Sequence, residues 1–207
     1  MSSAVLVLGT HNKKKLHELV ELLAPHGLEL KTLADYPDSL EVEESGDTFA
    51  ANAALKATLQ ARHLGQWVLG EDSGLAVDAL GGAPGVYSAR FSGAGATDAK
   101  NNALLLEKLA AVPLEKRTAH YVCHATLSDP QGNIRAEAEN YCRGRILFAE
   151  SGAGGFGYDP LFEVIECHRT FGELSPAVKS VLSHRSRAIR ALVPKIVGLI
   201  QSGAWKA

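Results

Sequence analysis

Two adjacent carboxylates near the middle of the chain could take part in chemistry. Glu71 and Asp72 directly follow Gly70 and a short apolar run at 67–69, where a strand would end and deliver them to the edge of a sheet. An earlier loop, residues 41–44, holds three more glutamates. Each group alone would ordinarily be solvated surface. If the two groups meet, their oxygens suit a hard cation. Mg²⁺ fits best, because it takes one or two protein carboxylates and completes its shell with water and phosphates.

Cations stand at the start of two predicted helices, where the helix dipole disfavours them. One helix opens on the lysines at 13–15, and the last helix follows Ser183 with His184 and Arg185. A bound anion would resolve the conflict, because free backbone amides and cationic side chains together cradle phosphates. Lysines that simply reach solvent would explain either cluster alone. Two such clusters favour anion binding, although the loop at 9–15 has neither the Walker A nor the dinucleotide-binding pattern.

A glycine-rich segment, 152–160, carries Phe156, Tyr158 and Asp159. These aromatic residues could belong to the core of a tight turn. An aromatic ring on such a loop, followed by a carboxylate, is equally what stacking on a nucleobase and bonding to its edge would require. Both interpretations stay open at this point.

Other reaction classes lack their usual patterns. Ser73 has no GxSxG segment around it, and the eight histidines show no HExxH spacing. The three cysteines form no CxxC pair, so neither a disulfide framework nor a zinc cluster is indicated, and a reducing cytoplasm is the simplest compartment.

Composition narrows the partners and the domain count. The chain has 207 residues, of which 46% are hydrophobic, with a net charge of -2. A chain of this length can bury a large core as one domain, residues 1–207, which could form two lobes. No strongly basic surface is available for nucleic acid or an acidic membrane. The apolar run at 4–8 is too short for a signal peptide or a membrane span.

The predicted elements alternate in a mixed order. A turn-forming segment at 129–133 joins two strand patterns as a β-hairpin, so not all strands can be parallel. Helices are predicted after caps at Thr48, Thr97, Ser175 and Ser183. The expected strands lie near 4–8, 28–33, 67–69, 120–127, 134–141 and 161–165, and the helices near 13–24, 49–63, 98–109 and 184–200. This pattern predicts an α/β fold with helices packed on a mixed sheet.

The motifs together resemble one family, the inosine triphosphate pyrophosphatases, also described as dITP/XTP or non-standard purine nucleoside triphosphate pyrophosphatases. The segments that carry the resemblance are THNKKK (10–15), EESG (43–46), EDSGLAVDALGGAPGVYSAR (71–90), GGFGYDP (154–160) and KSVLSHR (179–185). They span nearly the whole chain in the family's order. The resemblance implies an elongated mixed β-sheet flanked by helices, two lobes with a central active-site cleft, and a homodimer.

The resemblance also implies an Mg²⁺-dependent hydrolase that cuts between the α and β phosphates of a purine nucleoside triphosphate. Glu43 and Asp72 would bind the metal, and Asp72 would accept the proton of the attacking water. The implied substrate contacts are Thr10, His11, Asn12, Lys13, Lys14 and Lys15 for the phosphates, Ser73 for the nucleotide, Phe156, Gly157, Tyr158 and Asp159 for the base, and Lys179, His184 and Arg185 for base and phosphates.

Selectivity would rest on the purine 6-oxo group, which a donor such as Arg185 would satisfy. The 6-amino group of ATP would leave that donor unpaired, which costs about 1–3 kcal/mol. The chain departs from many bacterial members at three positions: His11 and Lys14 replace glycines, and Glu71 replaces an aspartate. Glu71 could therefore reach the metal or serve another purpose.

Two other function classes stay open. One is a phosphatase or pyrophosphatase for another nucleotide, such as a modified pyrimidine triphosphate, although the purine-reading segments argue against it. The other is a non-enzymatic nucleotide sensor, which would need the anion sites but not the carboxylates Glu43 and Asp72.

Overall fold

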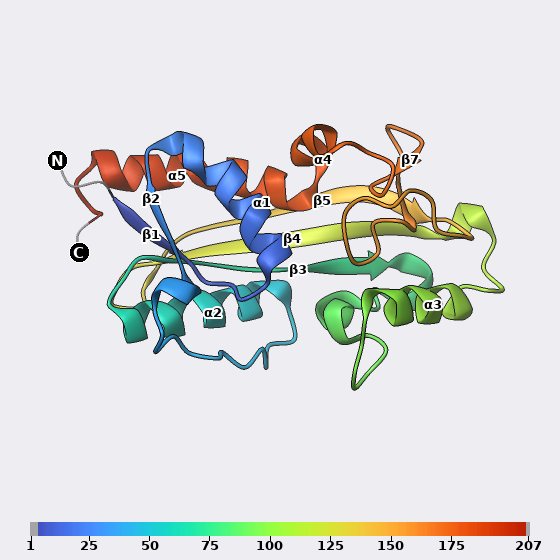
Figure 1. The fold of residues 1–207 in the computed structure, drawn as a ribbon, viewed down its shortest axis with the longest axis horizontal. Helices are drawn as coiled ribbons and strands as arrows, with labels where there is room; N and C mark the ends of the chain where they lie inside the picture. The colour runs from blue at the N-terminus through green and yellow to red at the C-terminus, as the bar shows by residue number, and fades with distance from the viewer. Residues whose placement is uncertain (1–3, 206–207) are drawn as a thin grey trace. The chain divides into compact units, whose positions relative to one another are not determined.

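The computed structural model describes residues 4–205, in which seven strands form one mixed sheet (Figure 1). The strands are β1 (Val5–Leu8), β2 (Glu29–Thr32), β3 (Val68–Val77), β4 (Thr118–Ser128), β5 (Ile134–Ile146), β6 (Phe162–Val164) and β7 (Arg169–Thr170). Their order in the sheet is β2-β1-β3-β4-β5-β6-β7. β1 runs parallel to β2 and β3, whereas β6 is antiparallel to β5 and β7. The predicted mixed sheet is confirmed.

The helices begin where their capping residues predict. Thr48, Thr97 and Ser175 each accept a hydrogen bond from an amide in the first turn of the helix that follows. The helices are α1 (Lys13–Leu23), α2 (Phe49–Leu64), α3 (Asp98–Lys108), α4 (Pro176–Leu182) and α5 (His184–Gln201). Along residues 4–205, none of these helices is both long enough and apolar enough to cross a lipid bilayer.

The chain divides into two compact units. Among the described residues, unit 1 contains 4–72, 123–140 and 185–205, and unit 2 contains Ser73–Val122 and Tyr141–His184. The strands β3, β4 and β5 each contribute residues to both units. The expected cleft between two lobes stays a prediction.

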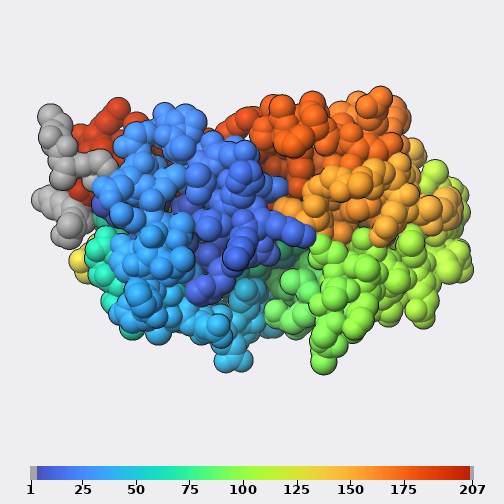
Figure 2. All heavy atoms as spheres, in the orientation of Figure 1, coloured from blue at the N-terminus to red at the C-terminus, as the bar shows by residue number. Residues whose placement is uncertain are grey.

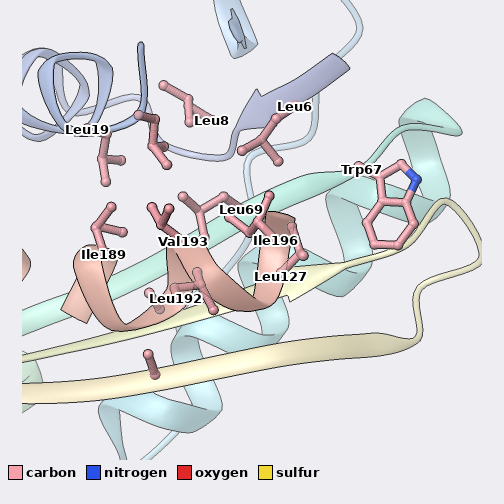
Figure 3. Packing of buried hydrophobic residues seen from close by; sticks show 13 residues of the cluster. Leu6, Leu8, Leu19, Trp67, Leu69, Leu127, Ile189, Leu192, Val193 and Ile196 are labelled. Atoms are coloured by element: carbon pink, nitrogen blue, oxygen red, sulfur yellow. The ribbon is translucent and has the colours of Figure 1, made fainter. Parts of the chain in front are cut away.

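Strand alternation in β1 gives unit 1 a core on both faces of its strands. Leu6 and Leu8 face α1 and α5, where they join a buried cluster with Leu19 and Ile189 (Figure 3). Val7 faces the other way, into a cluster with residues of α2 and β3. In Figure 1, α1 and α5 accordingly lie on one face of these strands and α2 on the other.

Unit 2 has a separate apolar core. Leu75 of β3, Leu105 of α3 and Phe162 of β6 belong to one buried cluster. The rings of Phe162 and Phe171 stack with their centroids 5.5 Å apart. Each unit therefore buries apolar surface of its own, which is the main stabilising term for such a fold.

β3 is longer than the sequence predicts. The expected strand at 67–69 was wrong in extent, because β3 continues to Val77 and holds Glu71 and Asp72 within it. Glycines and acidic residues have low strand propensity, so the sequence of residues 70–74 does not predict a strand. β1 ends at Leu8, opposite Leu69 of β3, while β4 lies on the other side of β3 in the sheet. The strand pairing therefore overrides the local propensity.

Gly70 lets α2 approach β3 closely. A Cβ at this position would lie 2.5 Å from the carbonyl oxygen of Ala53 and 2.6 Å from the amide nitrogen of Ala57. Both are backbone atoms of α2, so they cannot move aside as a flexible side chain would. α2 can therefore pack this close to β3 only because residue 70 is a glycine and has no side chain.

Gly70→Ala is expected to lower the free energy of unfolding by about 2 kcal/mol or more, since overpacking forces the backbone to shift. Urea denaturation of the two proteins measures the difference. Gly198→Ala in α5 is the matched control, because its Cβ would meet no atom within 4 Å and alanine favours a helix. Equal stability of Gly70→Ala and the wild type would contradict the close approach.

Candidate active site

The loop after β1 and the first turn of α1 place their side chains in two different environments. His11, Asn12, Lys13 and Lys14 are exposed, and this part of the chain lies at the surface of unit 1 in dark blue in Figure 2. Lys15 differs, because its side chain is only 16% exposed. Of the three lysines at the start of α1, Lys15 therefore turns toward the interior of unit 1.

Asn12 caps α1 with its own side chain. Its Oδ1 accepts hydrogen bonds from the amides of Lys14 and Lys15 at 3.0 and 3.1 Å. Its own amide donates to Oγ1 of Thr10 at 3.2 Å. These residues form a compact, ordered helix start of the type that also binds anions. Two of its amides are already satisfied by the protein, so a bound phosphate would rely on the remaining donors and on the lysines.

Glu71 is the centre of a buried ion cluster in unit 1. Its side chain has no exposed surface, and Oε1 lies 3.0 Å from Nζ of Lys15 and 3.3 Å from Nη2 of Arg185. The Cys123 thiol donates to Oε2 at 3.3 Å. Arg185 pairs through Nη1 with Glu18 of α1. The cluster thus joins α1, β3, β4 and α5.

The cations keep Glu71 ionised. Burial alone would raise its pKa, but Arg185, Lys15 and Lys56 together hold the pKa well below its usual range. The pKa of the Cys123 thiol moves the other way, because burial and then the charge of Glu71 raise it. Cys123 is therefore a neutral donor. It is fully buried, and its thiol makes a polar contact there.

Asp72 faces a different set of residues. Its Oδ1 lies 3.0 Å from Nζ of Lys56, and its Oδ2 accepts a hydrogen bond from Asn52 at 3.3 Å. Nζ of Lys56 also lies 3.3 Å from Oε1 of Glu44. Burial raises the pKa of Asp72 above its usual value, while Lys56 and Lys15 oppose that rise. Two carboxylates thus share one ammonium group beside β3.

A polar row on α2 holds this arrangement, and the sequence analysis missed it. Asn52, Lys56 and Gln60 are spaced by four residues, so they share one face of the helix. Asn52 Oδ1 accepts the amide of Gly46 at 2.8 Å, and Gln60 bonds to both backbone groups of Leu40 at 3.0 Å. The row therefore anchors the acidic loop at two points. The sequence feature that indicates this row is a polar residue at every fourth position of α2, between alanines that are buried.

The predicted metal ligands are only partly brought together. Glu43 is exposed, and it is Glu44 that shares Lys56 with Asp72. Within residues 4–205, no group of three or more histidine, cysteine, aspartate or glutamate side chains is arranged to hold a metal ion. Two carboxylates that converge on one cation nevertheless fit Mg²⁺, which needs few protein oxygens when phosphates supply others.

Unit 2 gathers the residues expected to read a base. Asp159 Oδ2 accepts hydrogen bonds from Nζ of Lys179 and from the amide of Phe156, both at 2.8 Å. Nζ of Lys179 also lies 4.6 Å from the centroid of the Phe156 ring. A half-buried aromatic ring, an ammonium group and a carboxylate are therefore held together. Such a set can stack on a planar ring and bond to its polar edge.

Tyr158 and His184 belong to the interior of unit 2. Tyr158 is 3% exposed and donates its hydroxyl to the carbonyl of Ser88 at 2.8 Å. The ring of His184 stacks on that of Tyr121, with centroids 4.7 Å apart. Burial and the nearby Asp159 raise the pKa of Tyr121 well above its usual value. The core interpretation therefore describes Tyr158 better than base stacking does.

Gly157 and Ser73 complete the set of expected contacts. The amide of Gly157 donates to Oδ2 of Asp98 at 2.9 Å, which ties the glycine-rich loop to the start of α3. Ser73 is half-buried in β3 and belongs to unit 2, whereas the preceding Asp72 belongs to unit 1. The expected residues are therefore distributed over both units: the phosphate and carboxylate residues lie in unit 1, with Arg185, and the others lie in unit 2.

Lys56→Met is expected to lower the free energy of unfolding by about 3 kcal/mol, because Asp72 and Glu44 lose the cation that compensates their charge near a buried strand. Urea denaturation at neutral pH measures the loss. Lys100→Met is the control, since Lys100 is an exposed lysine whose ammonium group donates to the carbonyl of Gly95. An equally small effect of both substitutions would contradict the role of Lys56.

Comparison with known proteins places this arrangement in a family. The Ham1 family profile matches residues 6–195. A relative from Rhodopirellula baltica is 54% identical over 98% of this chain and 97% of its own length, and one from Exiguobacterium sp. is 49% identical over 93% and 96%. Both relatives are named dITP/XTP pyrophosphatase.

Solved structures agree with the sequence comparison. A HAM1 protein from Coxiella burnetii has a TM-score of 0.86 at 35% identity, with 94% of this chain and 98% of that chain covered. A nucleoside-triphosphatase, dITP/XTP pyrophosphatase, from Mycobacterium abscessus has a TM-score of 0.75 at 42% identity, with coverage of 93% and 99%. The chain therefore belongs to the Ham1 family.

Proposed function

We propose that the protein hydrolyses non-standard purine nucleoside triphosphates (ITP, dITP and XTP) to the nucleoside monophosphate and pyrophosphate. The observation that carries the proposal is the cluster in unit 1, where a helix start with three lysines lies next to a strand that bears two carboxylates. Lys15 contacts Glu71 and Lys56 contacts Asp72, both at 3.0 Å. Relatives that match nearly the whole chain are named dITP/XTP pyrophosphatase, which supports the same reaction here.

Mg²⁺ is the cofactor that the donor set suits. Asp72 would hold it, with Glu44 a better placed second ligand than the originally expected Glu43. When bound, Mg²⁺ would neutralise charge on the phosphate oxygens and on the leaving pyrophosphate. Hard carboxylate oxygens and a site that already attracts a cation are the features that support this assignment.

Asp72 would orient the attacking water and accept its proton. Asn52 and Lys56 fix the two carboxylate oxygens, so the side chain is held before substrate arrives. Burial raises the pKa of Asp72, which makes the ionised carboxylate a stronger base than one in water. Lys15 and Lys56 would bind the polyphosphate and stabilise the charge that develops as the bond to the leaving group breaks.

Base recognition would fall to unit 2. Phe156 would stack on the purine, and Lys179 would donate to its 6-oxo group. Lys179 suits that task better than Arg185, because both terminal nitrogens of Arg185 are in ion pairs with Glu18 and Glu71. A 6-amino group cannot accept a hydrogen bond from an ammonium donor, so ATP would lose the contact that a 6-oxo group makes with Lys179. The homodimer and a cytoplasmic location stay predictions.

Pyrophosphate release is expected from ITP, dITP and XTP with Mg²⁺ and to be abolished by EDTA. GTP, ATP and dUTP are expected to react much more slowly, ATP because its 6-amino group cannot satisfy the Lys179 donor. A coupled pyrophosphate assay on each of the six nucleotides measures the rates. Preferential cleavage of dUTP would favour the pyrimidine alternative, and binding without EDTA-sensitive release from any nucleotide would favour a sensor.

Asp72→Asn is expected to keep the fold and to lower kcat for ITP by roughly 100-fold to 10,000-fold, because the water loses its proton acceptor. Steady-state turnover and circular dichroism are measured together. Asp47→Asn, at an exposed position shortly before α2, is the matched control and should retain normal turnover. Near-normal turnover by Asp72→Asn would remove Asp72 from the mechanism.

A further inference from the structure

Glu71 and Asp72 are neighbours in the sequence but do not face the same residues. Both lie inside β3, and consecutive side chains of a strand point to opposite faces of the sheet. Glu71 contacts Lys15 and Arg185 of the helices α1 and α5, whereas Asp72 contacts residues of α2. The two carboxylates therefore do not form a single chelating pair.

Both carboxylate oxygens of Glu71 already contact donors within unit 1. One oxygen accepts from both Lys15 and Arg185, and the other accepts from the Cys123 thiol. The side chain is fully buried, with 0% of its surface exposed. A magnesium ion needs a ligand oxygen at about 2.0–2.1 Å in near-octahedral geometry, which would displace these donors. The contacts of Glu71 thus indicate that it holds two cationic side chains of the protein, Lys15 and Arg185.

We propose that Glu71 is a positioning residue, which holds the Lys15 ammonium group where the polyphosphate binds, and that Cys123 fixes the Glu71 carboxylate in turn. This inference rests on the proposed function, because Lys15 is assigned to the phosphates there. Lys15 has a long side chain with many rotamers, and a fixed carboxylate partner removes most of that freedom before substrate arrives. An ammonium group has three donors, so one can remain on Glu71 while others reach phosphate oxygens.

The same cluster keeps two cations close together without net repulsion. Lys15 and Arg185 meet at one oxygen of Glu71, and Glu18 pairs with the other side of Arg185. Without the charge of Glu71, the two cations would repel each other in a poorly solvated place. Lys15 would then leave its present position, so the effect of losing Glu71 is expected to appear through Lys15.

A double-mutant cycle tests this coupling. The full-length wild type, Lys15→Met, Glu71→Gln and the double variant are titrated with inorganic tripolyphosphate in EDTA by calorimetry, so that no metal contributes. Lys15→Met is expected to weaken binding about tenfold in the wild type and less than about threefold in the Glu71→Gln background. Equal factors in the two backgrounds, no effect of Lys15→Met, or no tripolyphosphate binding by the wild type would each overturn the proposal.

The Mg²⁺ requirement separates positioning from metal ligation. The concentration of Mg²⁺ that half-saturates ITP turnover is expected to stay within about twofold of the wild type in Glu71→Gln, because the ligand Asp72 is intact. A rise of roughly tenfold or more would make Glu71 a metal ligand and overturn the proposal.

Two substitutions of Cys123 test the role of the thiol. They leave Glu71 in place, so the test can be made even if Glu71→Gln does not fold. Cys123→Ser keeps a donor for Glu71, and Cys123→Ala removes it. Lys15→Met is expected to weaken tripolyphosphate binding by a smaller factor in the Cys123→Ala background than in the Cys123→Ser background. Equal factors in the two backgrounds would overturn the part of the proposal that concerns the Cys123 thiol.

The outcome is also separable from that of the proposed function. Pyrophosphate release from ITP by the wild type, with independent effects of Lys15 and Glu71 on tripolyphosphate binding, would overturn only this inference. Coupled effects on tripolyphosphate binding in a wild type that releases no pyrophosphate from any nucleotide would overturn only the proposed function.

Discussion

The unit 1 site depends on the burial of one negative charge. A carboxylate with no exposed surface is tolerated only when cations and donors compensate it, and Glu71 finds these on three other elements. Lys15 comes from the start of the first helix, Arg185 from the start of the last one, and Cys123 from the adjacent strand. One cation at each of the two helix starts is therefore matched by a carboxylate that the fold brings to it.

A second constraint separates the two carboxylates of the motif. β1 ends opposite Leu69, while β3 continues, so Glu71 and Asp72 lie beyond the last paired residue of β1. Alternation along the strand then gives each carboxylate its own neighbours. Asp72 meets the polar row of α2, where Lys56 and Asn52 hold its carboxylate oxygens and Lys56 also pairs with Glu44. One short segment thus supplies the centre of a buried ion cluster and a second carboxylate that contacts α2.

The two units gather different kinds of side chain. Unit 1 combines cations and carboxylates, which is suited to polyphosphate, and unit 2 combines Phe156, Lys179 and Asp159, which is suited to a polar aromatic ring. Each set is held by hydrogen bonds and ion pairs within its own unit and by a separate apolar core. A purine nucleoside triphosphate carries both kinds of group, a polyanion and a polar aromatic base, so each set suits one part of such a molecule.

Most of the fold and part of the site could be predicted from the sequence, because they depend on local patterns. Apolar periodicity and capping residues located the helices and most strands, and the resemblance named the segments around Lys15 and Asp72. Local patterns did not predict three features: how far β3 extends, toward which helices Glu71 points, and that Lys56 and Asn52 contact Asp72. They depend on pairing with neighbouring strands, on the close approach of α2 at Gly70, and on charges far apart in the chain. Local sequence determined where the elements begin, and tertiary packing decided which charges are buried together, because the cost of a buried charge depends on its neighbours in space.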